Sequence, residues 1–399
     1  MFVGWDRGNT AHDMTVINAE GERVYRMTVP HTEDGIGRAI TALADHGHAT
    51  DLPVAIETTR GLVVDRLLAA GHPVIPIHPN AFHAARPRWG AARAKSDPGD
   101  SFTLADYART DGHRLRRLTG TGVETLELQA LTRQRGDQLE LRTAAVNQLA
   151  ALLDTYWPGG KTVFAALHSV IALAFLDRYP TPQAAAALTP KRMEAFCRKH
   201  SYSGRRSGVA LTERMGSAPQ SAARLSEPVV AQLIRSQVAI VRALQSGIDA
   251  LDKIISEKVA AHPYAPLLAH LPRIGVLNLA QIIGEVGPIL ERVTSFDQLA
   301  AETGVAPITR ASGKSHVVCF RHATNRRARQ ALHTWFDNTR HADPWARQRY
   351  ADARARGQRH PHALRTLGRS WLRIIWACWR TETPYDPEHR STRNQPLAA

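Results

Sequence analysis

This sequence has few cysteines, no long apolar run and no start typical of a signal peptide, which are three features of secreted or membrane proteins. Its 399 residues include only three cysteines, which lie far apart without CxxC or CxxH spacing: Cys197, Cys319 and Cys378. That argues against a zinc knuckle or a disulfide framework and is typical of a reducing cytoplasm. No apolar run approaches the ~20 residues of a membrane span. The opening MFVGWDRGNT has an acid in its first apolar stretch, unlike a signal peptide, so we expect a cytoplasmic protein.

Acidic residues are also in short supply, and the shortage is uneven. Lysine and arginine number 51 against 36 acids, which gives a net charge of +15 and a pI of about 10.3. From Ile308 to Arg380 there are sixteen Arg or Lys residues and only three acids. A basic surface of this kind attracts polyanions and predicts nucleic-acid binding. The candidate contacts are Arg310, Lys314, Arg321, Arg326, Arg327 and Arg329.

The hydrophobic pattern predicts an α/β part followed by helical parts. Residues 1–115 combine three short strands in an antiparallel meander with a later alternation of helix and strand, the element order of an RNase H-like (RuvC-like) domain. The expected strands cover residues 2–5, 14–18, 23–29, 53–56 and 73–77, and a last helix begins near Asp97. We expect a helical arm at 116–265, a mostly helical carboxy-terminal domain at 266–380 and a disordered tail at 381–399.

Within the arm, residues 120–157 predict one long helix. A coiled-coil seam with steps of three and four follows in residues 230–259, at Val241, Leu244, Ile248, Leu251 and Ile255. Its partner is either the helix at 120–157 or a second copy of the chain. Residues 160–225 predict no function. Further on, residues 271–275 and the helix after them resemble a helix–hairpin–helix element, with Arg273 where glycine is usual.

Four acids stand out by position. Asp6 follows the first strand and Glu57 follows the fourth, while Asp97 and Asp100 lie three residues apart at a helix start. In an RNase H-like sheet these carboxylates converge, and they then need a cation such as Mg²⁺ to offset their repulsion. Each also has a purely structural interpretation: Asp97 as an N-cap before a proline, Glu57 as a surface acid, and Asp6 as an ion-pair partner of a nearby arginine.

A serine beside glycine forms a second candidate site. Ser312 precedes Gly313 and Lys314, and such a hydroxyl is open to a DNA phosphate, with Arg310, Lys314 and His316 available to assist it. The alternative is an ordinary Ser-Gly turn. Ser315 is the other candidate nucleophile, and we prefer Ser312 because it adjoins the glycine.

A rival interpretation comes from residues 6–10. Asp6-Arg7-Gly8-Asn9-Thr10 fits the DxGxT phosphate loop of actin-like ATPases and sugar kinases. Those enzymes also need a second glycine-rich phosphate loop and an adenosine-binding motif, and neither is found here. A kinase also has no use for the basic segment near the carboxyl end.

Together these motifs resemble one family, the DEDD transposases of insertion sequences of the one-ten type, which are bridge-RNA-guided recombinases. The likeness spans residues 2 to about 380. It rests on the acids at Asp6, in Ala55–Thr59 and in Lys95–Asp100, on Arg142 and Asn147 of the long helix, on Leu271–Gly287, and on Gly304–Pro307 with Ser312–Lys314. Departures are Arg273 for glycine, Ser101 for a common alanine, and Pro98-Gly99 between two of the acids.

The resemblance implies a mechanism and partners. A RuvC-like domain would bind Mg²⁺ through Asp6, Glu57, Asp97 and Asp100, and Ser312 would form a covalent phosphoserine link to DNA. A non-coding guide RNA would pair with donor and target DNA, and the working assembly would be a homo-oligomer, a dimer or tetramer, acting at a prokaryotic nucleoid. Two alternatives remain: a metal-dependent nuclease or junction resolvase in which Ser312 is structural, and an inactive nucleic-acid-binding scaffold.

Overall fold

The computed structural model describes residues 1–89, 97–118, 120–222, 224–313 and 315–387, without the side chains of Asp97, Pro98 and Ser315. The chain forms two compact units, Met1–Gly120 and Thr121–Ala399. The finer division of the second unit into an arm and a carboxy-terminal domain stays a prediction. The start of the expected disordered tail is ordered: Tyr385 is buried, and its N–H donates to the carbonyl of Leu267 at 3.0 Å. The rest of that tail, from residue 388, lies outside the described residues.

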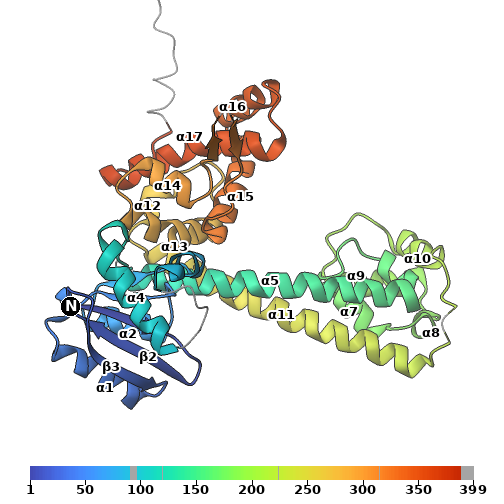
Figure 1. The fold of residues 1–399 in the computed structure, drawn as a ribbon. Helices are drawn as coiled ribbons and strands as arrows, with labels where there is room; N and C mark the ends of the chain where they lie inside the picture. The colour runs from blue at the N-terminus through green and yellow to red at the C-terminus, as the bar shows by residue number, and fades with distance from the viewer. Residues whose placement is uncertain (90–96, 119, 223, 314, 388–399) are drawn as a thin grey trace, which may run out of the picture. The chain divides into compact units, whose positions relative to one another are not determined.

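The first unit is built on one mixed sheet (Figure 1). Its strand order is β3-β2-β1-β4-β5; β1 to β3 are antiparallel, and β4 and β5 run parallel to β1. The strands are β1 Phe2–Asp6, β2 Ala11–Ile17, β3 Arg23–Pro30, β4 Val54–Ile56 and β5 Val74–Pro76. All five were predicted, because their apolar residues are bounded by turn signals. The α/β class of this part is therefore confirmed.

Helices cover both faces of this sheet. On one face, Trp5 and Met14 pack in one core with Leu43 of α1 and Leu67 of α2. On the other face, Ala55 packs with residues of α3 and α4. The helices are α1 Glu33–Ala44, α2 Leu62–Ala69, α3 Pro79–Ala85 and α4 Asp97–Asp111, with short 3-10 turns at Ala49–Asp51, Arg86–Trp89 and Gly112–Arg114.

Helix α4 lies directly against β1. A Cβ added to Gly4 would be 1.9 Å from the carbonyl oxygen of Ser101 and 2.5 Å from the nitrogen of Ala105, so only glycine permits this approach. Small residues on α4 replace the apolar stripe that a helix packed on a sheet usually shows.

Two hydrogen bonds give the direction of α4. Near its start, the Ser101 hydroxyl pairs at 2.8 Å with Thr15 in the middle of β2. Near its end, Arg109 Nη1 donates at 3.2 Å to the carbonyl of Ala19, beyond the end of β2 and thus beside the amino end of β1. Because α4 therefore runs antiparallel to β1, its first residue, Asp97, lies towards the carboxyl end of β1.

The second unit contains two long helices side by side, α5 Val123–Tyr156 and α11 Glu227–Ala261 (Figure 1). The seam residues Val241, Ile248 and Ile255 of α11 are buried. Gly247 fits closely against α5, since an added Cβ would lie 2.8 Å from Gln138 Oε1. Of the two partners that the sequence allowed for the seam, the chain's own long helix is the one found.

Each end of the helix pair carries a helical cluster. One contains α6 Pro158–Thr162, α7 Val170–Arg178, α8 Pro182–Ala185, α9 Pro190–Lys199 and α10 Gly208–Gly216, packed around Phe175. The other contains α12 Ala265–Leu268, α13 Val276–Arg292, α14 Phe296–Glu302, α15 Arg326–Ala342, α16 Pro344–Ala355 and α17 His360–Thr381, with a hairpin, β6 Ile308–Ser312 and β7 Ser315–Cys319. The described part of the chain has no helix long and apolar enough to span a membrane. Arg273 has φ 56°, which explains why glycine is usual there.

Candidate active-site acids and nucleic-acid interface

Asp6 is the last residue of β1, and Glu57 directly follows β4, the parallel strand beside it. The register pairs Trp5 with Ile56, so Asp6 and Glu57 follow side by side at the carboxyl edge of the sheet. Side chains alternate along a strand, and Trp5 and Ile56 face the α1–α2 side. Both acids therefore face the side covered by α4, and both are partly exposed.

The other two predicted acids lie at the start of α4. Asp97 is its first residue, but its side chain lies outside the described structure. Asp100 is 8% exposed and its Oδ2 lies 2.5 Å from Arg86 Nη2. Arg86 is held there by its position over the Phe82 ring, 4.9 Å from the centroid. Among the side chains that are described, no group of three or more His, Cys, Asp or Glu residues could hold a metal ion.

Asp13 is an acid that the sequence reasoning missed. It pairs in register with Asp6 across β1 and β2, so it lies on the same face. Its Oδ1 accepts hydrogen bonds from Arg26 at 2.9 Å and Thr28 at 3.3 Å. Asp13 is not one of the predicted metal ligands, and its place opposite Asp6 on the same face makes it a matched control. Its period-two alternation along β2 was the signal that could have found it.

Ser312 lies at the tip of the β6–β7 hairpin. It is exposed, faces Ser315 in the register, and is followed by Gly313 at φ 54°, the left-handed conformation that short hairpin loops require. Arg310 is two residues away and shares a face of the ribbon with Ser312. His316 pairs with Ala311 and so emerges on the opposite face. The Ser-Gly turn is present, and it leaves the hydroxyl open to a ligand.

The predicted nucleic-acid contacts divide into two kinds. Arg310 and Arg326 are exposed and make no hydrogen bond or ion pair with described residues. The other described members hold the protein together. Arg321 donates to the carbonyls of Ala306 and Pro307, Arg327 pairs with Asp137 at 2.8 Å, and Arg329 donates to the carbonyl of Arg321. Lys314 lies outside the described residues.

Two family models match the chain. Residues 3–158 match a model of DEDD transposases of the IS110 type, described as a transposase, and residues 265–351 match the transposase IS116/IS110/IS902 family. The chain belongs to the IS110/IS116 family of transposases. It is therefore an enzyme that acts on DNA, and the alternative of an actin-like ATPase or sugar kinase is not supported.

Relatives of this transposase match over nearly their whole length. A protein described as a transposase for the mini-circle IS117 of Streptomyces coelicolor is 31% identical, covering 97% of this chain and 96% of the relative. The 42 kDa protein of insertion element IS900 from Mycobacterium paratuberculosis is 29% identical over 97% of both chains. The 43.6 kDa protein of IS110 from Streptomyces coelicolor is 27% identical over 97% of this chain and 95% of its own.

Aromatic rings position many arginines of the transposase's basic segment. Arg329 and Arg365 both lie over the Phe320 ring, at 4.9 and 5.0 Å from its centroid. Arg369 and Arg373 both lie over Phe296, at 5.5 and 5.0 Å. Cation–π contacts of this kind hold like charges close together on a surface. Packing against these two rings therefore keeps the arginine side chains close together.

His333 of α15 lies beside these arginines. Its burial, together with the positive charges of Arg365 and Arg329 and the neighbouring His360, lowers its pKa to about 4. Its Nε2 has no hydrogen-bond partner among the described residues. The ring is therefore neutral at pH 7, and protonating it would add a cation to a basic cluster.

We expect the free energy of unfolding to fall as the pH is lowered from 6.5 towards 4. In that window the unfolded chain binds a proton at this histidine and the folded chain does not, which costs up to about 1.4 kcal/mol per pH unit. His333→Gln should flatten the slope, measured from urea midpoints at several pH values. The exposed His270→Gln is the control, and equal slopes in both variants would refute the assignment to His333.

Proposed function

We propose that this transposase cuts and rejoins DNA through a covalent phosphoserine at Ser312, assisted by Mg²⁺ at Asp6, Glu57, Asp97 and Asp100. The observation that carries the proposal is the placement of Asp6 and Glu57 side by side at the carboxyl edge of the sheet, on the face that α4 covers. The strand order and the antiparallel course of α4 support an RNase H-like (RuvC-like) assignment.

The donor set at this edge fits a hard divalent cation. Asp6 and Glu57 offer carboxylate oxygens only, the ligands that Mg²⁺ prefers, and the amino end of α4 is directed towards them. Asp100, the fourth proposed ligand, already forms an ion pair with Arg86. Bound there, Mg²⁺ would neutralise charge on a phosphodiester and activate an oxygen nucleophile. Asp6 and Glu57 would hold the ion, and Asp97 would complete the set.

In the proposed cleavage, Ser312 Oγ attacks a DNA phosphorus. The Oγ–P bond forms as the bond from phosphorus to one deoxyribose oxygen breaks, and that oxygen leaves as a hydroxyl after taking up the proton lost by the serine. Rejoining reverses these changes with another strand's hydroxyl, so no ATP is needed. Arg310, on the same face of the hairpin as Ser312, is placed to neutralise the phosphate.

The remaining parts of the proposal concern partners. A guide RNA that pairs with donor and target DNA would choose the sites, while the arginines of the carboxy-terminal cluster contact backbones. Exposed apolar residues at heptad spacing support a homo-oligomer: Leu233, Ile240 and Ile254 of α11 are 38, 47 and 41% exposed.

The test is a search for the covalent adduct. Purified protein, Mg²⁺, co-expressed RNA and end-labelled DNA spanning an element junction are incubated and run on a denaturing gel. We expect a protein–DNA adduct that survives denaturation, vanishes in Ser312→Ala and persists in Ser226→Ala, a serine at the start of α11.

Cleaved DNA without an adduct would favour the metal-dependent nuclease or resolvase. An adduct that persists in Ser312→Ala and vanishes in Ser315→Ala would move the nucleophile to Ser315. DNA binding without cleavage, unchanged by Asp97→Asn with Asp100→Asn, would favour an inactive scaffold.

A further inference from the structure

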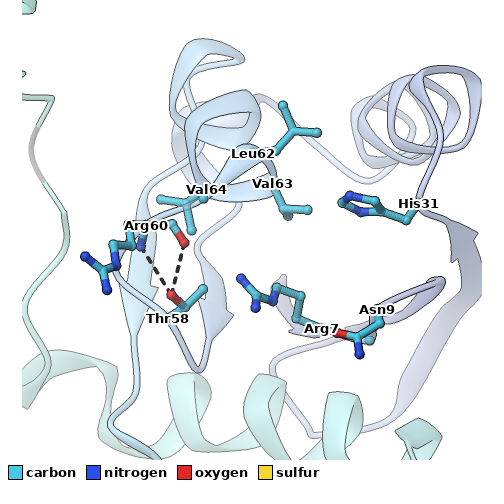
Figure 2. Close-up of a pocket in the computed structure, with 10 residues that line it drawn as sticks. Arg7, Asn9, His31, Thr58, Arg60, Leu62, Val63 and Val64 are labelled. Atoms are coloured by element: carbon cyan, nitrogen blue, oxygen red, sulfur yellow. Dashed lines mark hydrogen bonds between the residues drawn. The ribbon is translucent and has the colours of Figure 1, made fainter. Parts of the chain in front are cut away.

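A hollow of about 260 Å³ opens at the carboxyl edge of the sheet in the first unit (Figure 2). It is lined by the loop after β1 and by the start of α2, with His31 at the end of β3. Strands β1 and β4 are neighbours in the sheet. The chain continues from β1 to β2 on one side and from β4 to β5 on the other, so the two connections diverge at this point. Open α/β sheets bind ligands outside the carboxyl ends of strands at such a switch point.

The hollow is positively charged. Figure 2 shows the Arg7 side chain extending towards the first turn of α2, whereas Arg60 points away. Arg7 makes no ion pair or hydrogen bond with a described residue, and none of the residues that line the hollow is acidic. Other arginines of this unit are neutralised by carboxylates, for example Arg66 by Glu33 and Arg88 by Asp111. An unpaired guanidinium in a hollow is suited to an anionic ligand.

Backbone donors meet the same space. The cap residue of α2 is Gly61, with φ 113° and no side chain to satisfy the first N–H groups of the helix, which belong to Leu62, Val63 and Val64. A Cβ at Gly61 would lie 3.5 Å from Arg7 Nη1, so the guanidinium lies next to the amino terminus of α2. Free N–H groups beside a guanidinium are a recurrent arrangement for phosphate.

A histidine pair, in which His12 is buried and His31 is exposed, adds a further donor. His12 is 1% exposed; its Nε2 lies 2.8 Å from Nδ1 of His31, and its own Nδ1 has no hydrogen-bond partner among the described residues. A buried N–H left without an acceptor is costlier than a bare ring nitrogen. The favoured tautomer therefore has His12 donating to His31, which leaves the proton of His31 on Nε2, the nitrogen free to donate to a ligand. Burial and the nearby His31 and Arg7 lower the pKa of His12, consistent with a neutral ring.

We propose that this hollow binds a phosphate group of a nucleic-acid strand through Arg7, Asn9, His31 and the first turn of α2. The phosphate is either an internal phosphodiester or a 5′-terminal monoester, because both present the same oxygens. Arg7 directly follows Asp6, and Thr58, which also lines the hollow, directly follows Glu57. A phosphate held here brings the adjoining part of the strand to the two acids. The site thus deepens the proposed function by positioning the strand.

The test measures binding in EDTA, where no metal-dependent cleavage occurs, so failure of the serine mechanism would leave its result unaffected. Full-length protein is titrated into fluorescein-labelled single-stranded DNA bearing a 5′-phosphate or a 5′-hydroxyl, at several salt concentrations. Arg7→Gln is compared with Arg23→Gln, the same charge change at the opposite edge of the sheet, where Arg23 is exposed and unpaired among described residues. Asn9→Asp adds a carboxylate to the hollow at nearly constant volume and covers the case in which Arg7→Gln fails to fold.

We expect Arg7→Gln and Asn9→Asp to weaken binding about tenfold, and Arg7→Gln to reduce the salt slope by about 0.7, while Arg23→Gln has less than a third of either effect. A 5′-phosphate preference lost in Arg7→Gln assigns the terminal phosphate, and equal affinity for both strands with the reduced slope assigns an internal one. If millimolar inorganic phosphate displaces either labelled DNA from the wild-type protein but not from Arg7→Gln, the result also supports a phosphate site in this hollow. Equal effects of Arg7→Gln and Arg23→Gln, with Asn9→Asp unchanged, overturn the proposal.

Discussion

Glu57→Gln, and separately Asp6→Asn, is expected to reduce DNA strand cleavage by about a thousandfold or more without weakening DNA binding. Each change removes one carboxylate charge from a pair at the ends of adjacent strands. The charge stabilisation lost with a bound metal amounts to several kcal/mol, and each ~1.4 kcal/mol is tenfold in rate. Affinity should hold or rise, because an acid that repels phosphate is gone. Single-turnover cleavage with guide RNA and Mg²⁺, and anisotropy in EDTA, measure the two effects.

Asp13→Asn is the matched control. Asp13 lies on the same face, opposite Asp6, and its Oδ1 accepts hydrogen bonds from Arg26 and Thr28. We expect its cleavage rate to stay within about tenfold of the wild type, since no catalytic charge is lost. If Asp13→Asn lost as much activity as Glu57→Gln, the loss would reflect a general disturbance of the structure on this face and not the removal of a metal ligand. Normal cleavage in Glu57→Gln would remove Glu57 from the site.

The elements predicted correctly are those whose apolar residues recur with a regular period. The strands of the sheet and the two long helices each bury one face, and burial imposes the period that the sequence displays. The partner of the α11 seam stayed open because Val241 and Ile248 pack equally well on a helix of the same chain or of another. Only the fold brings α5 alongside.

The elements that were missed lack such a period. The β6–β7 hairpin is exposed on both faces, including Val317 and Val318, which are 50 and 61% exposed, so no alternation marks it as strand. The four candidate acids stand out in the sequence because each lies at the end of an expected strand or near the start of an expected helix, and their role as metal ligands stays a prediction. The pairing of Asp100 with Arg86 and the hollow at Arg7 depend on tertiary contacts between distant segments, which no local pattern records.

Glu285→Ala is expected to destabilise the second unit by about 3 kcal/mol. Glu285 of α13 is 3% exposed and accepts hydrogen bonds from Arg133 Nε at 2.6 Å, Arg133 Nη2 at 2.9 Å and Asn325 Nδ2 at 3.2 Å. Breaking a buried pair costs about 3–5 kcal/mol because the remaining charge is left unpaired. Arg133 is 25% exposed and regains some water, which favours the lower figure. Urea unfolding followed by tryptophan fluorescence gives the change.

The pair joins three elements, because Arg133 lies on α5, Glu285 on α13, and Asn325 caps α15 by accepting from the N–H groups of Arg327 and Ala328. Glu291→Ala, at an exposed acid on the same helix, should cost at most about 0.5 kcal/mol. Replacing both partners by methionine should recover much of the loss, since no buried charge is then left alone. If Glu285→Ala costs under about 1 kcal/mol, water replaces the pair, and the long helix α5 is held to the carboxy-terminal cluster by apolar packing alone.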